Sequence, residues 1–496
     1  MSDWRNELID AGLTFSDILL RPQYSELQTR ADKEGGPTTE TFLTPNIKLS
    51  VPIISANMDT VTGSTMAIAM ARYGGIGILH RNCSIEEQVK EVKKVKSAEE
   101  TLIRDPYTLY PNSSVSQLRH LMAEKQIDSV LVVNSDVDNQ LVGLITKYEV
   151  ANAEDSKEIF RYMKPVDKLI FIKTEKPLNE SKAVQFAQNI FKSQPLLGKL
   201  PFVDEKGKLI GLLTKKDLFR FTEFPDATKD ALGRLRVGAA IGVDSSAEAR
   251  VGELLKAGVD VLVLDVAHAH AKKPMEVVKL IRSNFPQCEL IVGNVATFEA
   301  VRDLTTLGVS AIKVGIGPGA VCSTRIIAGA GVPQVSAILE CTRQAEKSGI
   351  PIIADGGIRY PRDISLAIAC GASSVMIGTL FAGTDESPGD IIDDNGRLVK
   401  IVRGMSSLSV NISLKGDSFI KAGLKDMIQP EGVTGQVPYR GSLVRVLGAL
   451  VAGLRSGMTY TGSRTIKELQ KPFPRKFCKM SLAAWDESKP HDIRII

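Results

Sequence analysis

The chain has 496 residues, of which 43% are hydrophobic and 24% are charged, and its formal net charge is only +5. This composition is typical of a globular protein too long for one core, so we expect two domains. The near balance of charge, without any basic block, argues against nucleic-acid binding. Because there is no apolar run of 18 residues and no apolar signal core near the N-terminus, we expect no membrane span and no secretion, and a cytoplasmic location.

The six cysteines, at positions 83, 288, 322, 341, 370 and 478, form no CxxC pair and no disulfide-like spacing. We therefore expect free thiols in a reducing compartment. The close pair His268 and His270 is better explained as loop or pocket polar groups than as metal ligands, because a zinc site needs more ligand-type residues nearby.

Short apolar runs recur along the chain with helical segments between them, and each ends in glycine or a polar residue. The runs are 52–55, 75–79, 237–241, 261–264, 290–292, 311–314, 351–354 and 374–377. Strands that alternate with helices predict an α/β fold with a parallel sheet, and eight is the number that closes a (β/α)8 TIM barrel.

Residues able to do chemistry follow most of these runs, among them Asn57, Asp265, Asn294, Cys322 and Asp355. In a (β/α)8 barrel the active site lies at the carboxyl ends of the strands, so we expect these side chains to meet there. Turn formation alone explains a glycine or a polar residue at any one strand end. It does not readily explain why such residues follow seven of the strands.

A repeat interrupts this alternation. Residues 141–147 read LVGLITK and residues 209–215 read LIGLLTK, and each copy follows an apolar strand and a polar turn. We predict paired modules at 98–222, inserted between a first barrel part at 1–97 and a second at 223–496.

These copies resemble tandem cystathionine β-synthase-type (Bateman) modules, which often bind purine nucleotides. The resemblance implies a regulatory nucleotide site that uses Thr146, Thr214 and Asp217, although Glu149 replaces the expected Asp in the first copy. The alternative is that the modules act only as spacers or oligomer contacts.

Cys322 lies in the most informative segment, which reads KVGIGPGAVCSTR from Lys313 to Arg325. Its glycines let backbone approach a ligand closely, and a helix that begins just after the thiol would aim free amides at sulfur or phosphate. We interpret Cys322 as a nucleophile beside a phosphate-bearing substrate. The alternative is a small buried cysteine beside a turn.

Several motifs in a fixed order accompany this loop. They are Ala56-Asn-Met-Asp-Thr60, Gly74-Gly-Ile-Gly77, Gly293-Asn-Val295, 314–325, Ile353-Ala-Asp-Gly-Gly357, Arg403-Gly-Met405, and Glu431-Gly432 followed by Val437-Pro-Tyr439. With these motifs the barrel resembles the inosine 5′-monophosphate (IMP) dehydrogenase and guanosine 5′-monophosphate (GMP) reductase superfamily over nearly its full length.

The resemblance implies that Cys322 attacks purine C2 to form a covalent adduct, and that Thr324 and Glu431 relay a proton. Asp355 is implied to hold the ribose hydroxyls, and the amides of 356–357 and 378–379 the 5′-phosphate. The full set of implied substrate contacts is Ala56, Met58, Asp355, Gly356, Gly357, Gly378, Thr379, Gly404, Met405 and Ser406.

The resemblance further implies a nicotinamide cofactor, a monovalent cation such as K+ on the carbonyls of Gly317, Gly319 and Cys322, and homotetramers that can stack into octamers. The implied cofactor contacts are Asp265, Val266, Ala267, His268, Asn294, Gly315 and Gly317.

Three departures from the dehydrogenase pattern favour a reductase. Met427 and Ile428 stand where dehydrogenases carry Arg and Tyr on a flap, here about 406–436, that activates water, and 265–268 and 405–407 read as in reductases. We therefore predict an NADPH-dependent GMP reductase that converts GMP to IMP and ammonia. The alternatives are an IMP dehydrogenase using NAD and a nucleotide-sensing assembly protein with little catalysis.

Overall fold

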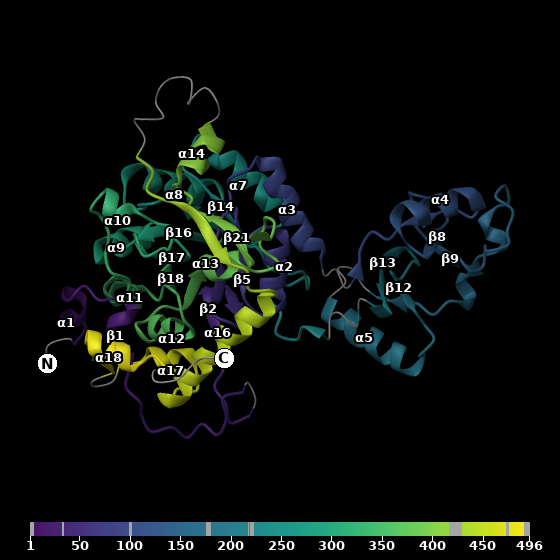
Figure 1. Cartoon of the computed structure of the whole chain (residues 1–496). Coiled ribbons are helices and arrows are strands. Elements are labelled where there is room, and N and C mark those ends of the chain that lie inside the picture. Colours follow the sequence, from purple (N-terminus) through teal and green to yellow (C-terminus); the bar gives the residue numbers. More distant parts are fainter. Residues whose placement is uncertain are drawn as a thin grey trace. The chain divides into compact units, whose positions relative to one another are not determined.

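The computed structural model describes residues 4–31, 34–98, 102–174, 180–216, 218, 223–415, 429–472 and 476–490. Two compact units emerge (Figure 1): a larger unit of residues 1–96, 226–228 and 235–496, and a smaller unit of residues 97–225 and 229–234. Each is described by itself.

The larger unit is a closed barrel of parallel strands, which confirms the predicted (β/α)8 architecture. The strand order around the barrel is β14 (Gly238–Ile241), β15 (Val261–Asp265), β16 (Leu290–Val295), β17 (Ala311–Val314), β18 (Ile352–Asp355), β19 (Ser374–Ile377), β4 (Ile53–Ser55) and β5 (Ile76–Leu79). Each strand overlaps one of the predicted apolar runs, because a parallel strand covered on both faces is apolar along nearly its whole length.

Helices follow the strands and cover the barrel. They are α2 (Ser64–Arg72), α3 (Ile85–Ser97), α7 (Ala247–Lys256), α8 (Lys272–Asn284), α9 (Phe298–Thr306), α11 (Gln334–Ser348), α12 (Pro361–Ala369) and α16 (Leu443–Tyr460). Local signals set their ends: the Thr297 hydroxyl caps α9 by accepting a bond from the Ala300 amide, and Gly349 ends α11 at a left-handed φ of 70°.

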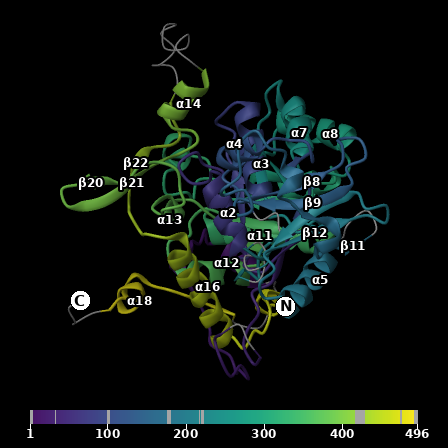
Figure 2. The same ribbon diagram turned by 90° about the vertical axis from the view of Figure 1, so that its right-hand side faces the viewer.

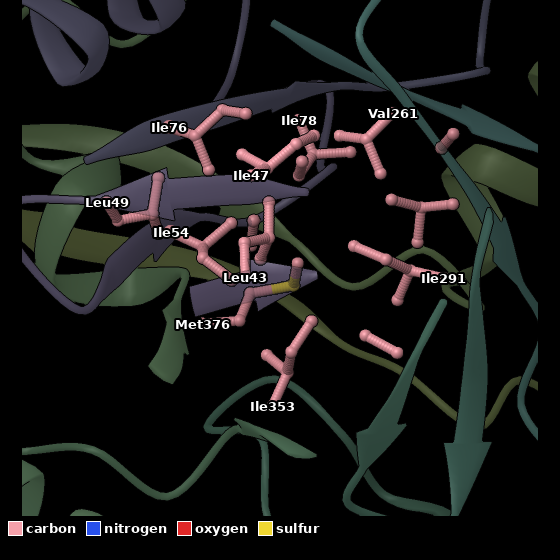
Figure 3. Close-up of a cluster of buried hydrophobic side chains, with 14 residues drawn as sticks. Leu43, Ile47, Leu49, Ile54, Ile76, Ile78, Val261, Ile291, Ile353 and Met376 are labelled. Carbon is pink, nitrogen blue, oxygen red and sulfur yellow. The ribbon is translucent and has the colours of Figure 1, made fainter. Parts of the chain in front are cut away.

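A hairpin of β2 (Thr41–Thr44) and β3 (Ile47–Leu49) packs against the barrel interior. Figure 3 shows Leu43, Ile47 and Leu49 beside side chains of the barrel strands, including Ile54 and Ile291. Leu43, Ile47 and Leu49 are at most 1% exposed, so each adds on the order of 1.5–3 kcal/mol of burial free energy.

The remaining elements of the larger unit are short. They are α1 (Trp4–Asp10), β1 (Ile18–Leu20) paired with β23 (Phe477–Lys479), α10 (Thr324–Ile327), α13 (Thr379–Ala382), α14 (Leu408–Lys415), α17 (Ile466–Gln470), α18 (Leu482–Glu487), and a sheet of β20 (Ile392–Asp394), β21 (Arg397–Arg403) and β22 (Thr434–Pro438). Figure 2 shows the β20 and β21 hairpin at one side of the view. The buried Lys400 ammonium fixes β21 to the segment 384–387 by donating to the carbonyls of Thr384 and Ser387 at 2.9 and 2.8 Å.

The smaller unit contains two similar halves. One sheet has the order β10 (Lys164–Pro165), β9 (Leu141–Thr146), β8 (Ser129–Val133), β7 (Thr108–Leu109) beside α4 (Val115–Lys125), and the other has β11 (Ile172–Lys173), β12 (Lys199–Val203), β13 (Leu209–Thr214), β6 (Leu102–Ile103) beside α5 (Glu180–Ser193). The repeated segments form β9 and β13, and Leu141 and Leu209 share one apolar cluster. Within the described part of the chain, no helix is long and apolar enough to span a membrane.

Candidate active site

Cys322 begins a short chain of polar contacts at the carboxyl end of the barrel. The side chain is exposed, and its Sγ donates to Thr324 Oγ1 at 3.2 Å. Thr324 Oγ1 in turn donates to Glu431 Oε2 at 2.8 Å. A thiol, a hydroxyl and a carboxylate in this order can pass a proton away from, or back to, an atom bound at the sulfur.

Backbone pairing brings Glu431 to this place from more than a hundred residues along the chain. Cys322 and Gly432 form an antiparallel bridge, and the Ser323 amide donates to the Glu431 carbonyl at 2.9 Å. The Val433 amide donates to the Val321 carbonyl at 3.0 Å. The carboxylate is therefore held by main chain on both sides of the thiol.

The glycines of the Cys322 loop are required for its path. A Cβ on Gly315, where φ is 149°, would lie 2.1 Å from the Asp355 carbonyl oxygen. At Gly317, where φ is 85°, a Cβ would meet the Arg325 side chain. Arg325 fixes the loop by donating to the Ile316 carbonyl at 3.2 Å.

The thiol faces a cavity of about 200 Å³. Its lining comprises Ala56, Asn57, Met58, Asp265, Val266, Ala267, Asn294, Lys313, Gly315, Ile316, Gly317, Val321, Cys322, Thr324, Asp355, Met376, Gly404, Met405, Ser406, Glu431 and Gly432. A second hollow of about 100 Å³ shares Ala56, Met58 and Asp355 with it, and it is also lined by Gly356, Gly357, Gly378 and Thr379. We call this second hollow the phosphate hollow, after the prediction that its amides hold a 5′-phosphate.

Lys313 organises the floor of the cavity. Its side chain is 2% exposed, and Nζ lies 2.8 Å from Asp265 Oδ1 and 2.5 Å from Asp355 Oδ2. Nζ also donates to Asn294 Oδ1, and Asn294 Nδ2 donates to Asp355 Oδ2 at 2.9 Å. Asn57 completes the group by donating to Asp265 Oδ2 at 2.9 Å.

The charges in this cluster stabilise one another. Burial alone would raise the pKa of Asp265, but Lys313 and Asn57 hold it below its ordinary value. Burial alone would lower the pKa of Lys313, but Asp265 and Asp355 raise it above its ordinary value. The lysine therefore stays cationic and Asp265 stays anionic at neutral pH.

A second ion pair positions the segment 404–406. Arg403 Nη2 donates to Asp59 Oδ2 at 2.5 Å, and Asn82 donates to the same oxygen at 2.5 Å. Burial would raise the pKa of Asp59, but these hydrogen bonds and the Arg403 charge lower it. Because Arg403 immediately precedes Gly404, this pair fixes where Met405 and Ser406 meet the cavity.

Most of the predicted site residues line the cavity or the phosphate hollow. His268 is exposed and is not among the residues that line either one, and it lies 6.3 Å from His270 between ring centroids. In the smaller unit, the Thr146 amide donates to Glu149 Oε2 at 2.6 Å, at the position where the module motif has Asp. Asp217, Met427 and Ile428 lie outside the described residues.

Sequence reasoning missed Lys313, although it quoted that residue as the start of the loop. A lysine inside an apolar strand was the available signal, because a buried lysine needs an anionic partner. Gln334, which donates to the Asp355 carbonyl at 3.1 Å, and Asn57 as a partner of Asp265 were missed too.

Potassium remains a prediction. Three backbone carbonyls are a donor type that suits a hard cation, although the Gly319 carbonyl also accepts the Cys322 amide at 3.0 Å. Among the residues that the structure describes, no three or more His, Cys, Asp or Glu side chains gather where they could hold a metal ion.

Residues 12–491 match the model of the IMP dehydrogenase / GMP reductase domain family. The chain belongs to this family. It is 46% identical to the inosine-5′-monophosphate dehydrogenase of Aquifex aeolicus, covering 98% of this chain and 96% of that protein. It is 43% identical to the same-named protein of Halalkalibacterium halodurans, over 99% of this chain and 98% of that one.

A solved structure of a GMP reductase variant from Trypanosoma brucei in complex with guanosine 5′-monophosphate has a TM-score of 0.84 to this chain. Its sequence identity is 39%, covering 97% of this chain and 98% of that one. The protein is thus an oxidoreductase of the IMP dehydrogenase and GMP reductase family, whose members act on purine nucleotides with nicotinamide cofactors.

The prediction of a GMP reductase is wrong. Relatives named inosine-5′-monophosphate dehydrogenase match the chain end to end at 41–46% identity, above the identity of the reductase structures. The prediction relied on a few loop residues. Asp265 to Ala267 and Met405 with Ser406 line the cavity, where either activity needs close contacts, so these residues discriminate poorly.

Proposed function

We propose that this chain is an IMP dehydrogenase, which oxidises IMP to xanthosine 5′-monophosphate (XMP) with NAD. The observation that supports this most is the contact series from Cys322 through Thr324 to Glu431 beside the cavity. The likeness to proteins named inosine-5′-monophosphate dehydrogenase over the whole chain supports oxidation of IMP as the direction of the reaction.

In this proposal the nucleotide spans the cavity and the phosphate hollow. The amides of Gly356, Gly357 and Thr379 take the 5′-phosphate, because positive φ at both glycines, 89° and 83°, turns the backbone without side-chain obstruction. Asp355 Oδ2 already accepts from Lys313 and Asn294, so Oδ1 is left to accept a ribose hydroxyl.

The reaction balances as two steps at C2. The Cys322 thiolate adds to C2 of IMP, and the C2 hydrogen leaves as hydride to the nicotinamide ring of NAD, giving NADH and a thioimidate on the enzyme. Water then adds to C2 and loses a proton, the carbon–sulfur bond breaks, and XMP and the thiolate are released.

The nicotinamide cofactor supplies the hydride acceptor when it is bound. The residues present are compatible with it, because Asp265, Val266 and Ala267, at the carboxyl end of β15, line the same cavity as Cys322. The side chain of Asn294 helps hold this wall by donating to the Gly315 carbonyl at 2.6 Å.

The hydrolysis step needs a base, and Glu431 is placed to provide it. Met427 and Ile428 occupy the positions where the resemblance expects Arg and Tyr. Water held at Thr324 Oγ1 can lose its proton through that hydroxyl to Glu431, 2.8 Å away. We expect hydrolysis to be slower than hydride transfer.

The test is to incubate the full-length protein with IMP plus NAD, and separately with GMP plus NADPH, while following the absorbance of the reduced cofactor. We expect NADH to form in the first mixture and XMP to accumulate. Oxidation of NADPH with release of ammonia, or an unchanged absorbance in both mixtures, would contradict the proposal.

We further propose that the smaller unit binds a regulatory purine nucleotide and that the chain forms a homotetramer. The two similar halves support the first point, because their repeated segments meet at a bridge between Gln140 and Lys208 and share one apolar cluster. Titration with ATP and GTP, together with sedimentation of the full-length protein, tests both.

A further inference from the structure

Three arginines line a hollow that lies apart from the Cys322 cavity. It measures about 620 Å³ and lies on the barrel unit between the start of α12 and the first half of α16. Arg359, Arg440 and Arg445 are all exposed, and they line it from three different segments. The other lining residues are Pro361, Leu380, Tyr439, Gly441, Val446, Ala449 and Leu450.

These guanidinium groups are not held in ion pairs, although the charge of Arg359 does interact with that of Asp363. Within the described ranges, none of the three has an ion pair or a side-chain hydrogen bond, and no carboxylate lines the hollow. Other arginines of the same unit do pair, as Arg403 does with Asp59. Gathering unpaired like charges around one concave surface costs free energy, which an anion would offset.

The carboxylates near these arginines already accept other hydrogen bonds. Asp363 accepts the Arg359 and Tyr360 amides at 2.8 and 2.9 Å, and Asp385 and Glu386 bind the segment 439–443. None of these carboxylates is among the residues lining the hollow, so the arginine side chains remain available to a ligand.

The hollow adjoins the phosphate hollow, because Arg359 lines both. Its remaining surface includes Leu380, Val446 and Leu450, which offer an apolar area beside the charged groups. A concave site of several hundred Å³ with few charged groups and an apolar wall is typical of small-molecule sites. A planar guanidinium binds phosphate oxygens through two parallel hydrogen bonds.

We propose that this arginine hollow binds the diphosphate group of a phosphorylated small molecule, separate from the nucleotide at Cys322. Arg440 and Arg445 hold the diphosphate, and Arg359 lies between it and the phosphate hollow. The apolar wall accommodates the rest of the ligand. Occupancy of the hollow therefore acts on the neighbouring phosphate hollow through Arg359.

Calorimetric titration of the full-length protein with inorganic pyrophosphate, and separately with ADP, tests this at constant ionic strength. The double variant Arg440→Gln/Arg445→Gln removes two guanidiniums. Arg397→Gln is the matched control, because Arg397 is an exposed arginine of β21 that does not line the hollow.

We expect wild-type protein and the control to bind one more pyrophosphate per chain than the double variant. The single variants Arg440→Gln and Arg445→Gln should each lower the affinity of that site for pyrophosphate about tenfold. Tighter binding of ADP than of pyrophosphate at this site assigns a nucleotide as the occupant, and equal binding assigns a free diphosphate. Identical site numbers and affinities in wild-type and double variant would overturn the proposal.

Discussion

Lys313 connects the two sides of the site at the scale of a single residue. It contacts Asp265 on the proposed cofactor side and Asp355 on the proposed ribose side. The buried ammonium has carboxylate partners in two different strands, so its loss would affect both binding regions together.

Replacing Lys313 with Met should destabilise the fold by about 3–5 kcal/mol, because it leaves buried carboxylates without their counter-charge. It should also abolish nucleotide turnover. Urea unfolding and turnover of Lys313→Met are compared with those of Lys400→Met. That control removes another buried lysine, which is held by the Thr384 and Ser387 carbonyls and does not line the cavity. Full activity in Lys313→Met would show that the cluster does not position the site.

The lowered pKa of Asp265 gives stability an acid dependence. The folded-state pKa lies below the ordinary 3.8, so the unfolded chain takes up the proton first as pH falls. The stability that the Asp265 carboxylate contributes is present above pH 3.8 and is lost as the pH falls below that value. Urea midpoints between about pH 5 and pH 3 should fall less steeply for Asp265→Asn than for wild type; equal slopes would contradict this reasoning.

Glu431 should matter most after hydride transfer. In Glu431→Gln the proposed proton acceptor is lost, and steady-state turnover should fall about a hundredfold or more while the first NADH per site still forms. Stopped-flow absorbance separates the two phases. Thr324→Val should likewise form the first NADH per site and then turn over slowly. Loss of that first NADH in both variants would instead assign Thr324 and Glu431 to hydride transfer or to a step before it.

At the scale of the elements, the strand-to-loop turn after β17 sets the position of the thiol. Gly315→Ala should abolish activity, because its Cβ would fall 2.1 Å from the Asp355 carbonyl oxygen. Gly319→Ala is the matched control in the same loop, since its Cβ would meet only Cys322 Cβ at an ordinary 3.5 Å. Circular dichroism and initial rates compare the two; equal activity would mean that the loop can shift.

The elements divide into those that local pattern predicts and those that it does not. The barrel strands were predictable because each contains a mostly apolar run bounded by glycine or a polar residue. The approach of Glu431 to Cys322 depends on a bridge between distant loops, so only resemblance to a family indicated it. Lys313 stayed hidden because its partners Asp265 and Asp355 come from other strands, and their convergence depends on barrel closure.

At the scale of the whole molecule, the smaller unit has its own apolar clusters, as does the barrel. A chain in which residues 97–225 are replaced by a short linker should therefore fold and keep turnover within about a few-fold of wild type. Its rate should no longer respond to added ATP or GTP. Initial rates with and without these nucleotides measure both properties, and an inactive but folded barrel would contradict this separation of roles.

The most direct test of the covalent mechanism is intact-protein mass spectrometry after rapid mixing with IMP and NAD and quenching in acid. The proposed mechanism predicts one nucleotide bound per chain, mapped by proteolysis to Cys322, appearing together with NADH and before XMP, and no adduct in Cys322→Ala. Formation of XMP without an adduct, or by Cys322→Ala, would contradict it.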